Sequence, residues 1–458
     1  MTNAEQLADF VRRASYEDIS AKAREQLKLH ILDSLGCAIG ALNGEPIRHV
    51  RDHINDFGGH PQCALIASGK TSPDRAAFYN SALVRYLDFN DSYFAKGEAC
   101  HPSDNLGAVL AAAEYADRSG RELLAALAVA YQVQCRLSDE APVRAKGFDH
   151  TTQGAYAAAA GIAKALALDE NKTANAIAIC GTAYNALRVT RTGALSHWKG
   201  LASANTAFGC THGTFLAMHG ITGPREVFEG NKGFKESIAG QFDINWAEED
   251  LERVTRTILK KYNAEIHAQS AVEGALELRA QHAVSASDIE SVQIDIFDVA
   301  FHIIGGGEEG DKTVVRTKEA TDHSLPYMIA VALLDGQLLP EQYELARITR
   351  NDVQLLLRKV TVRAVETYSQ RFPDQHACKV TIQLKNGGSL IREKTAYEGF
   401  HTNPMRWETV AAKFERLSDQ RTSSALRRQL IDVIHQLESL PVRELTRLLA
   451  EISLNQKG

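Results

Sequence analysis

The chain has 458 residues, of which 44% are hydrophobic and 24% are charged, and its 51 basic and 57 acidic residues leave a formal net charge of −6. This hydrophobic fraction excludes an intrinsically disordered chain, because enough apolar surface is available to form a core. The acidic balance argues against nucleic acid as a partner, since no basic excess remains to neutralise phosphates.

The placement of apolar and charged residues indicates a cytoplasmic protein. The longest apolar stretches, such as the alanine-rich run over residues 155–167, are interrupted by Gly161 and Lys164 and fall short of the roughly 20 residues that span a bilayer. Charged residues within the first turns leave no apolar core for a signal peptide. We therefore expect no membrane contact and no export.

The cysteines indicate reduced thiols. Their number is odd, they are widely spaced, and no two form a C-x-x-C pair, which argues against a disulfide framework and against a zinc site. Three cysteines that meet from distant positions, as ligands of an iron–sulfur cluster, stay an open alternative. The seven are Cys37, Cys63, Cys100, Cys135, Cys180, Cys210 and Cys378.

In chain order, the first part of the sequence predicts helices packed closely together. Apolar residues recur at helical spacing, as in Leu27, Ile31 and Leu35. Glycine, alanine and serine fill whole helix faces within residues 107–114, 154–163 and 202–209. Because small side chains let helix axes approach each other, residues 1–267 are predicted to form the first part of a large all-helical domain.

Residues 268–402 show a different pattern and predict a smaller α+β domain. Apolar residues alternate with period two in three runs, and Asn386-Gly-Gly is a hairpin signal before a fourth. Helical stretches lie between the runs, and the helical period returns over residues 403–458. The fold class is therefore mainly α, with an inserted α/β domain that resembles a lid and a helical domain completed by the C-terminal helices. The predicted strands cover residues 292–296, 360–362, 380–384 and 389–392, and the predicted helices residues 323–334 and 352–357.

Two histidines stand at the entrances of small-residue helices. His101 precedes a proline, and Ser103 and Asp104 are good N-cap residues for the helix that follows. His150 repeats the arrangement in the polar loop before the next such helix. Helix N-termini favour anions, so the two imidazoles could converge on one carboxylate. The alternative is a pair of capped helices with exposed histidines.

Two further clusters place polar groups beside apolar helices. Lys199 lies between Trp198 and Gly200, just before a long helix of small residues, which indicates a lysine in a pocket. A lysine that faces solvent is the alternative. Tyr327 lies in an apolar helix start, where a core tyrosine with a paired hydroxyl is the alternative to an active-site group.

Taken together, these segments resemble the MmgE/PrpD family. The matching motifs run in the family's order over almost the whole chain, and several motifs together are far more specific than any one. They are Leu-Asp-Ser-Leu-Gly-Cys-Ala at 32–38, Asp-Phe-Asn-Asp at 88–91, His-Pro-Ser-Asp at 101–104, Gly-Phe-Asp-His at 147–150, Trp-Lys-Gly at 198–200, Gly-Pro-Arg-Glu-Val-Phe-Glu-Gly at 223–230 and Asp-His-Ser-Leu-Pro-Tyr at 322–327.

The resemblance implies a two-domain homodimer that acts on small di- or tricarboxylates without a metal or organic cofactor. The family includes 2-methylcitrate dehydratase, cis-aconitate decarboxylase and an iminodisuccinate epimerase. Carried over by motif, the catalytic positions are His101, His150, Lys199, Tyr327 and Lys260, with the neighbouring Lys261 left open for the last. The positions expected to bind substrate are Asp91, Ser103, Asp104, Arg188, Arg191, His267 and His323.

The chemistry fits these residue types. Removing a proton beside a carboxylate creates a dianionic enolate, which demands a base and cationic donors. We expect His101 or His150 to move the carbon-bound proton, and the other imidazole or Tyr327 to protonate the departing hydroxyl. Lys199 and Lys260, with an arginine, would hold carboxylates in a locally basic pocket.

The expected activity is dehydration of 2-methylcitrate to 2-methylaconitate. Decarboxylation of cis-aconitate and epimerisation of an iminodisuccinate-like dicarboxylate stay open, because they differ in substrate pose rather than in residue type. A reading from another class is a non-catalytic carboxylate-binding or scaffold protein, in which the polar clusters are helix caps and dimer contacts.

Overall fold

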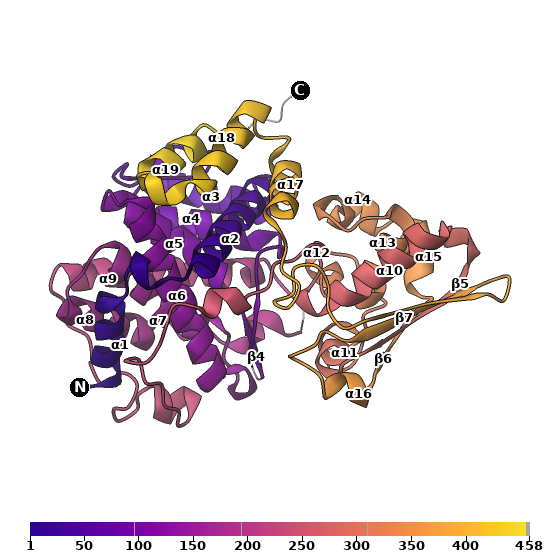
Figure 1. Cartoon of the computed structure of the whole chain (residues 1–458), viewed down its shortest axis with the longest axis horizontal. Coiled ribbons are helices and arrows are strands. Elements are labelled where there is room, and N and C mark those ends of the chain that lie inside the picture. Colours follow the sequence, from indigo (N-terminus) through magenta and orange to yellow (C-terminus); the bar gives the residue numbers. More distant parts are fainter. Residues whose placement is uncertain (96, 194, 309, 455–458) are drawn as a thin grey trace. The chain divides into compact units, whose positions relative to one another are not determined.

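The computed structural model describes residues 1–95, 97–193, 195–308 and 310–454. The chain divides into two compact units. The first, here called the helical unit, comprises Met1–Arg191, His197–Thr257 and Arg406–Gly458. The second, the sheet unit, comprises Thr192–Ser196 and Ile258–Met405. The predicted fold class, mainly helical with a small mixed sheet in the C-terminal half, is confirmed (Figure 1).

The helical unit is built from both ends of the chain. The late helix α17 packs against α2, and α19 packs against α5, so yellow and indigo segments lie side by side in Figure 1. No helix among the described residues is long and apolar enough to cross a membrane. The helices are α1 (Asn3–Arg13), α2 (Ala21–Gly40), α3 (Glu45–Phe57), α4 (Pro73–Tyr86), α5 (Leu106–Tyr115), α6 (Gly120–Glu140), α7 (Thr151–Ala165), α8 (Glu170–Ala183), α9 (Trp198–Met218), α17 (Trp407–Ser418), α18 (Ser424–His435) and α19 (Val442–Ala450).

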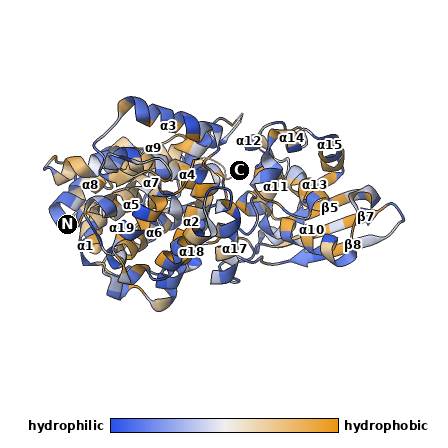
Figure 2. Cartoon of the chain, turned by 90° about the horizontal axis from the view of Figure 1, so that it is seen from above, coloured by the Kyte–Doolittle hydropathy of each residue, from blue (hydrophilic) through white to orange (hydrophobic). Residues whose placement is uncertain are grey.

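Close helix packing depends on small residues, as predicted. A Cβ atom added at Gly107 of α5 would lie 2.6 Å from the backbone nitrogen of Ser81 on α4. One added at Gly161 of α7 would lie 2.9 Å from the Cβ of Ala130 on α6. On the outside, α3 is amphipathic: Figure 2 shows orange residues among blue ones along it, and Ile47, Val50 and Ile54 are buried.

The helical unit also holds two short antiparallel ribbons that the helical periodicity did not predict. One joins β1 (Cys63–Ala64) to β2 (Lys70–Thr71), and the other joins β3 (Tyr93–Ala95) to β4 (Glu98–Cys100). The second ribbon leads directly into His101. After it comes a 3₁₀ turn, Pro102–Asn105, before α5 begins at Leu106.

The prediction that Ser103 and Asp104 cap the helix is wrong. The residue at the N-cap of α5 is Asn105, and no side chain there bonds the first turn. The hydroxyl of Ser103 instead donates to Asp91, and Asp104 accepts from Asn90. The side-chain oxygens of Ser103 and Asp104 are therefore bonded to the polar loop between α4 and β3 instead of to the first turn of α5.

The sheet unit carries a mixed sheet in the order β6–β5–β7–β8 among its described residues. The central strand β5 is parallel to β6 and antiparallel to β7, with Ile294 opposite Val362 and Val380. The hairpin predicted at residues 386–388 joins β7 to β8. The strands are β5 (Ile289–Ile296), β6 (Val360–Ala364), β7 (Cys378–Leu384) and β8 (Ser389–Lys394).

Helices cover the sheet and bury its apolar side chains. α10 contacts β7 and β8, while α11 and α13 contact β6. These helices and the buried residues of β5 and β7 form one core. The helices are α10 (Gln269–His282), α11 (Asp298–Ile304), α12 (Lys318–Thr321), α13 (Leu325–Asp335), α14 (Leu345–Ile348), α15 (Asn351–Leu357) and α16 (Glu366–Ser369).

All seven cysteines are buried and free, in agreement with the prediction of reduced thiols. Burial raises the pKa of the Cys63 thiol to about 12, and the nearby Glu114 carboxylate adds to this. Thiols in such surroundings act as small apolar side chains rather than as nucleophiles.

Candidate active site

The two histidines at the helix entrances lie together in the helical unit. The rings of His101 and His150 meet edge to face, with centroids 5.2 Å apart. His101 is 8% exposed and His150 is 4% exposed, so neither is the exposed histidine of the alternative interpretation. Their sequence separation gives no hint of this contact, which the packing of α5 and α7 creates.

Hydrogen bonds define the protonation state of His101. Its Nδ1 lies 2.7 Å from the backbone carbonyl oxygen of Asp91, which can only accept, so Nδ1 carries the proton. Its Nε2 lies 3.2 Å from Nη2 of Arg85, which can only donate, so Nε2 is the acceptor. One tautomer satisfies both contacts, the neutral imidazole with a lone pair on Nε2. This is the form required of a general base.

Asp91 fixes the loop that holds His101. Its fully buried carboxylate accepts from the Ser103 hydroxyl at 2.6 Å and from the Tyr131 hydroxyl at 2.8 Å. Nδ1 of His30 lies 2.9 Å from Oδ2, the oxygen that also accepts from Tyr131. Burial alone would raise the pKa of Asp91, but the contacts with His30, Ser103 and Tyr131 lower it below its usual value. Asp91 is therefore a charged anchor, whose contacts are all made inside the protein.

Asp88 links two cations beside His101. Its carboxylate lies 2.6 Å from Nη1 of Arg85 and 3.0 Å from Nζ of Lys199. The backbone of Asp88 has φ +53°, a left-handed conformation that costs energy for a residue with a side chain. Lys199 is 5% exposed, so the solvent-facing alternative does not apply. The geometry gives a fixed row of guanidinium, carboxylate and ammonium groups.

His150 lies between two carboxylates. Its Nε2 is 3.7 Å from Asp104 and its Nδ1 is 3.5 Å from Asp149, distances that complement a positive charge on the ring without direct hydrogen bonds. Burial opposes ionisation of Asp149, yet Arg191 at 2.5 Å and the nearby His150 lower its pKa well below the usual value. Arg191 also donates to the carbonyl oxygen of Lys199 at 3.2 Å. Arg191 thus holds the elements that carry His150 and Lys199.

Several buried polar atoms of this cluster have no hydrogen-bond partner among the described residues. They include Nε2 of His150 and Oδ2 of Asp104. Asp104 also lines a narrow cavity with Thr151 and Ser203. Unpartnered buried polar groups are costly, so Oδ2 of Asp104 and Nε2 of His150 mark where a hydroxyl group of a ligand would be stabilised.

Arg188 lies at the edge of this region. It begins the 3₁₀ turn Arg188–Arg191, its backbone N–H donates to the carbonyl of Gly147 at 2.9 Å, and its side chain is partly exposed. The contact joins the loop before His150 to the turn that carries Arg191.

The sheet unit brings together a second set of predicted residues. Lys260 is 1% exposed, whereas Lys261 is partly exposed and pairs with Glu398 at 2.7 Å. His267 lies 2.7 Å from the carboxylate of Glu265. Burial would raise the pKa of Glu265, but His267, His323 and Lys260 lower it to about 2. Burial and these couplings place Lys260, rather than Lys261, with the two histidines.

Tyr327 stands at the start of α13 in the core of the sheet unit. It is fully buried, its hydroxyl donates to the backbone carbonyl of Gln342, and burial raises its pKa. His323, four residues earlier, lies 2.5 Å from the carboxylate of Asp322. The contacts of Tyr327 in this structure are therefore those of the alternative interpretation, a core tyrosine with a paired hydroxyl.

Glu265 predicts a measurable loss of stability in acid. Its pKa is about 2 in the folded chain and about 4.3 when unfolded. The carboxylate therefore stabilises the fold fully above about pH 4.3, and this contribution, about 3 kcal/mol, disappears as the pH falls towards 2. We expect Glu265→Gln to lack this acid-dependent part in urea unfolding followed by circular dichroism. The exposed Glu290→Gln variant is the control, and equal acid slopes in both variants would contradict the assignment.

Sequence reasoning missed several members of the cluster. Arg85, Asp88, Asp149 and His30 were not among the expected site residues. Two of them had a signal, because Asp88 opens a motif of the family and Asp149 directly precedes His150. Arg85 lies three residues before Asp88, a spacing at which helical side chains can pair, whereas only the fold brings His30 to Asp91.

The helical unit buries a set of imidazole, guanidinium, ammonium and carboxylate groups, and comparison with known families identifies the class of protein. The MmgE/PrpD N-terminal domain matches residues 5–247 and the MmgE/PrpD C-terminal domain matches residues 262–439. The chain belongs to the MmgE/PrpD family.

Similar proteins are lyases. The chain is 26% identical to 2-methylcitrate dehydratase of Salmonella typhi, over 96% of this chain and 95% of that protein. It is 27% identical to 2-methylcitrate dehydratase of Cupriavidus necator, over 96% and 95% of the two chains. It is also 27% identical to cis-aconitate decarboxylase of Mus musculus, over 94% and 90%.

Proposed function

We propose that the protein is a cofactor-independent lyase that dehydrates 2-methylcitrate to 2-methylaconitate. The observation that carries the proposal is the pair of buried histidines, one fixed as a neutral acceptor by Arg85 and the other flanked by two carboxylates. An elimination of water needs one group that accepts a proton and one that donates a proton. The names of the dehydratase relatives support the choice of substrate.

In this mechanism His101 is the base. When the guanidinium of Arg85 turns from Nε2 to a substrate carboxylate, Nε2 takes the proton from the carbon beside that carboxylate, and the electron pair left behind expels the hydroxyl group. His150, as an imidazolium, gives its proton to the departing oxygen, so water leaves. Arg85 and Lys199 stabilise the enolate charge, each charge-assisted contact contributing about 1.5–3 kcal/mol. Arg191 and Asp91 position the reacting groups without touching the substrate.

The sheet-unit residues stay in the proposal as contributors to substrate binding or proton transfer. Lys260, His267, His323 and Tyr327 are each tested by a single substitution with KM and kcat measured separately. Arg188, Ser103 and Asp104 are tested in the same way. A homodimer in the cytoplasm is part of the proposal, and sedimentation of the purified protein tests the dimer.

Decarboxylation of cis-aconitate is the second candidate. The decarboxylase of Mus musculus is as similar to this chain as the dehydratases are, and over nearly as much of its length. The same acid and base would serve it, because a proton must be added at carbon while carbon dioxide leaves.

A substrate panel tests the function. The chelator-treated protein is incubated with 2-methylcitrate, citrate, cis-aconitate and iminodisuccinate, and products are followed by NMR. We expect 2-methylaconitate and water from the first. Loss of activity on chelation would contradict the claim that no metal is needed. Product from cis-aconitate alone would favour the decarboxylase, and inversion of iminodisuccinate would favour an epimerase. Inactivity on all four compounds would favour a binding protein.

We expect the pH profile of kcat/KM to shift when Arg85 is replaced. Without the guanidinium at Nε2, His101 gains a proton more easily, because a nearby cation disfavours the imidazolium. We expect Arg85→Met to lower kcat/KM at pH 7 about 10–100-fold and to move its acid limb to higher pH by about one unit. Arg85→Lys should restore part of the shift.

The exposed Arg48→Met variant controls for the loss of a positive charge. A fall in kcat/KM for Arg85→Met with an unmoved acid limb would mean that Arg85 has only a structural role, and would remove the assignment of His101 as the base.

A further inference from the structure

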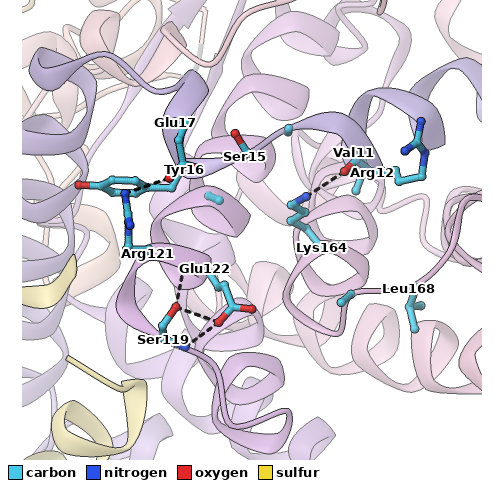
Figure 3. Close-up of a pocket in the computed structure, with 13 residues that line it drawn as sticks. Val11, Arg12, Ser15, Tyr16, Glu17, Ser119, Arg121, Glu122, Lys164 and Leu168 are labelled. Atoms are coloured by element: carbon cyan, nitrogen blue, oxygen red, sulfur yellow. Dashed lines mark hydrogen bonds and ion pairs between the residues drawn. The ribbon is translucent and has the colours of Figure 1, made fainter. Parts of the chain in front are cut away.

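A second pocket of the helical unit lies outside the cluster that carries His101 and His150. It has a volume of about 450 Å³. The C-terminal end of α1, the turn over residues 15–17, the N-terminal end of α6 and the C-terminal end of α7 form its walls (Figure 3). None of its lining residues belongs to the proposed active site, so its chemistry is independent of the proposed function.

The charged side chains of this pocket leave one positive charge in excess. Arg12, Arg121 and Lys164 line it together with the acids Glu17 and Glu122. Both acids already have partners: Glu17 lies 2.9 Å from Arg121, and Glu122 accepts from the backbone nitrogen of Ser119 at 2.8 Å. The carboxylates therefore serve the protein's own structure.

Lys164 is the cation that lacks such a partner. Its Nζ donates to the carbonyl oxygen of Arg12 at 3.1 Å, at the end of α1, as the dashed line in Figure 3 shows. No carboxylate of the described residues lies within ion-pair distance of it. An ammonium group has three N–H donors, so the contact with Arg12 leaves two of them for a ligand. Burial lowers the pKa of Lys164, and Arg12 and Arg118 add to this, while the more distant carboxylates of Asp18 and Glu122 act in the opposite direction.

Apart from Ser15, Ser119 and Tyr16, the rest of the pocket lining is apolar. Small and aliphatic side chains form its floor, among them Val11, Ala125 and Leu168. On one side stands Tyr16, whose ring is sandwiched between Arg121 at 4.4 Å and Arg24 at 4.0 Å. Cations on both faces fix the orientation of the ring. A ligand that fits here combines an anionic group with a compact apolar body.

We propose that this pocket binds a small organic anion, a carboxylate or a phosphate monoester, with its anionic group on Lys164 and its apolar body over the floor of the pocket. The ligand supplies the direct ion-pair partner that the described residues do not provide at this ammonium group, and the guanidinium groups of Arg12 and Arg121, although paired with Asp9 and Glu17, lie beside it. Such a site would let an anion other than the substrate bind the enzyme.

Pyridoxal 5′-phosphate is a suitable probe, because it combines a phosphate monoester with an aldehyde. The unprotonated Nζ of Lys164 attacks the aldehyde carbon, and water leaves as the imine forms. Borohydride then adds hydride to the imine carbon, which leaves a stable secondary amine for mass spectrometry. We expect Lys164 to be labelled at least about tenfold more than the exposed Lys22, because an ammonium with a lowered pKa provides more free amine.

Competition and variants decide the outcome. Protection of Lys164 by inorganic phosphate supports a phosphate ester as the ligand, protection by benzoate supports a carboxylate, and protection by neither overturns the proposal. Labelling of Lys164 no stronger than that of Lys22 also overturns it. Lys164→Met removes a contact with α1, so Arg121→Gln is the second variant, and it should weaken labelling while Lys22→Gln leaves it unchanged.

Discussion

Replacing His101 with alanine is expected to lower turnover by about 100-fold or more, and replacing His150 should cost as much. The reason is that elimination needs both proton transfers, and each histidine supplies one of them. The centroids of the two rings lie 5.2 Å apart, so both can reach one substrate. Turnover is measured at saturating 2-methylcitrate, near pH 7, where an imidazole serves as acid or base.

A matched control separates catalysis from general effects on the protein. His49 on α3 is exposed and pairs only weakly with Glu45, at 3.8 Å, so His49→Ala should keep the wild-type rate. Circular dichroism checks that the variants are folded. Rates close to wild type for both His101→Ala and His150→Ala would refute the mechanism, whatever the substrate.

Replacing Asp91 with alanine is expected to reduce the free energy of unfolding by about 3–5 kcal/mol, because it breaks a buried charged network. The carboxylate is fully buried and accepts from Ser103 and Tyr131, while His30 lies beside it. Its removal leaves those donors buried without an acceptor. Urea unfolding at pH 7 measures the loss, and the exposed Asp56→Ala variant on α3 is the control.

The pH dependence of stability in a second variant at this position, Asp91→Asn, gives a second readout. The pKa of Asp91 is lowered in the folded chain, so its ionised form stabilises the fold above the unfolded value of about 3.9. That contribution is lost as the pH falls through the folded value. Asp91→Asn should therefore lose less stability than wild type on acidification below about pH 4. An Asp91→Ala variant as stable as Asp56→Ala would contradict this role.

The periodicity of apolar residues predicted the helices and strands well, because the burial of apolar side chains determines which of these elements form. The alternating run at residues 380–384 became β7, and Asn386-Gly-Gly became its turn to β8. Glycine-rich helix faces predicted close packing, and Gly107 and Gly161 show it. The ribbon β3–β4 escaped prediction, since its strands are too short for a period to show.

The candidate site was only partly predictable. The resemblance to the family pointed to His101, His150 and Lys199, which the structure places close to one another or to shared partners in the helical unit. Residue spacing could not show that Asp88 bridges Lys199 to Arg85, because that contact depends on how α4 and α9 pack. The helix-capping rule failed at Ser103, because the hydroxyl of this residue donates to the buried carboxylate of Asp91 and does not cap α5.

The order in which the chain is made gives α17 a particular importance. Its Lys413 contacts both α2 and the loop between α4 and β3: Nζ lies 2.7 Å from Asp33 on α2, donates to the carbonyl of Phe89 in the loop at 2.8 Å, and stands over the Phe89 ring. A ribosome adds about 5–20 residues per second. The loop that contains Asp88 and Asp91 is therefore made well before Lys413, which stabilises it and follows it by more than 300 residues. A nascent chain that lacks α17 would expose the face of α2 that this helix covers in the folded protein.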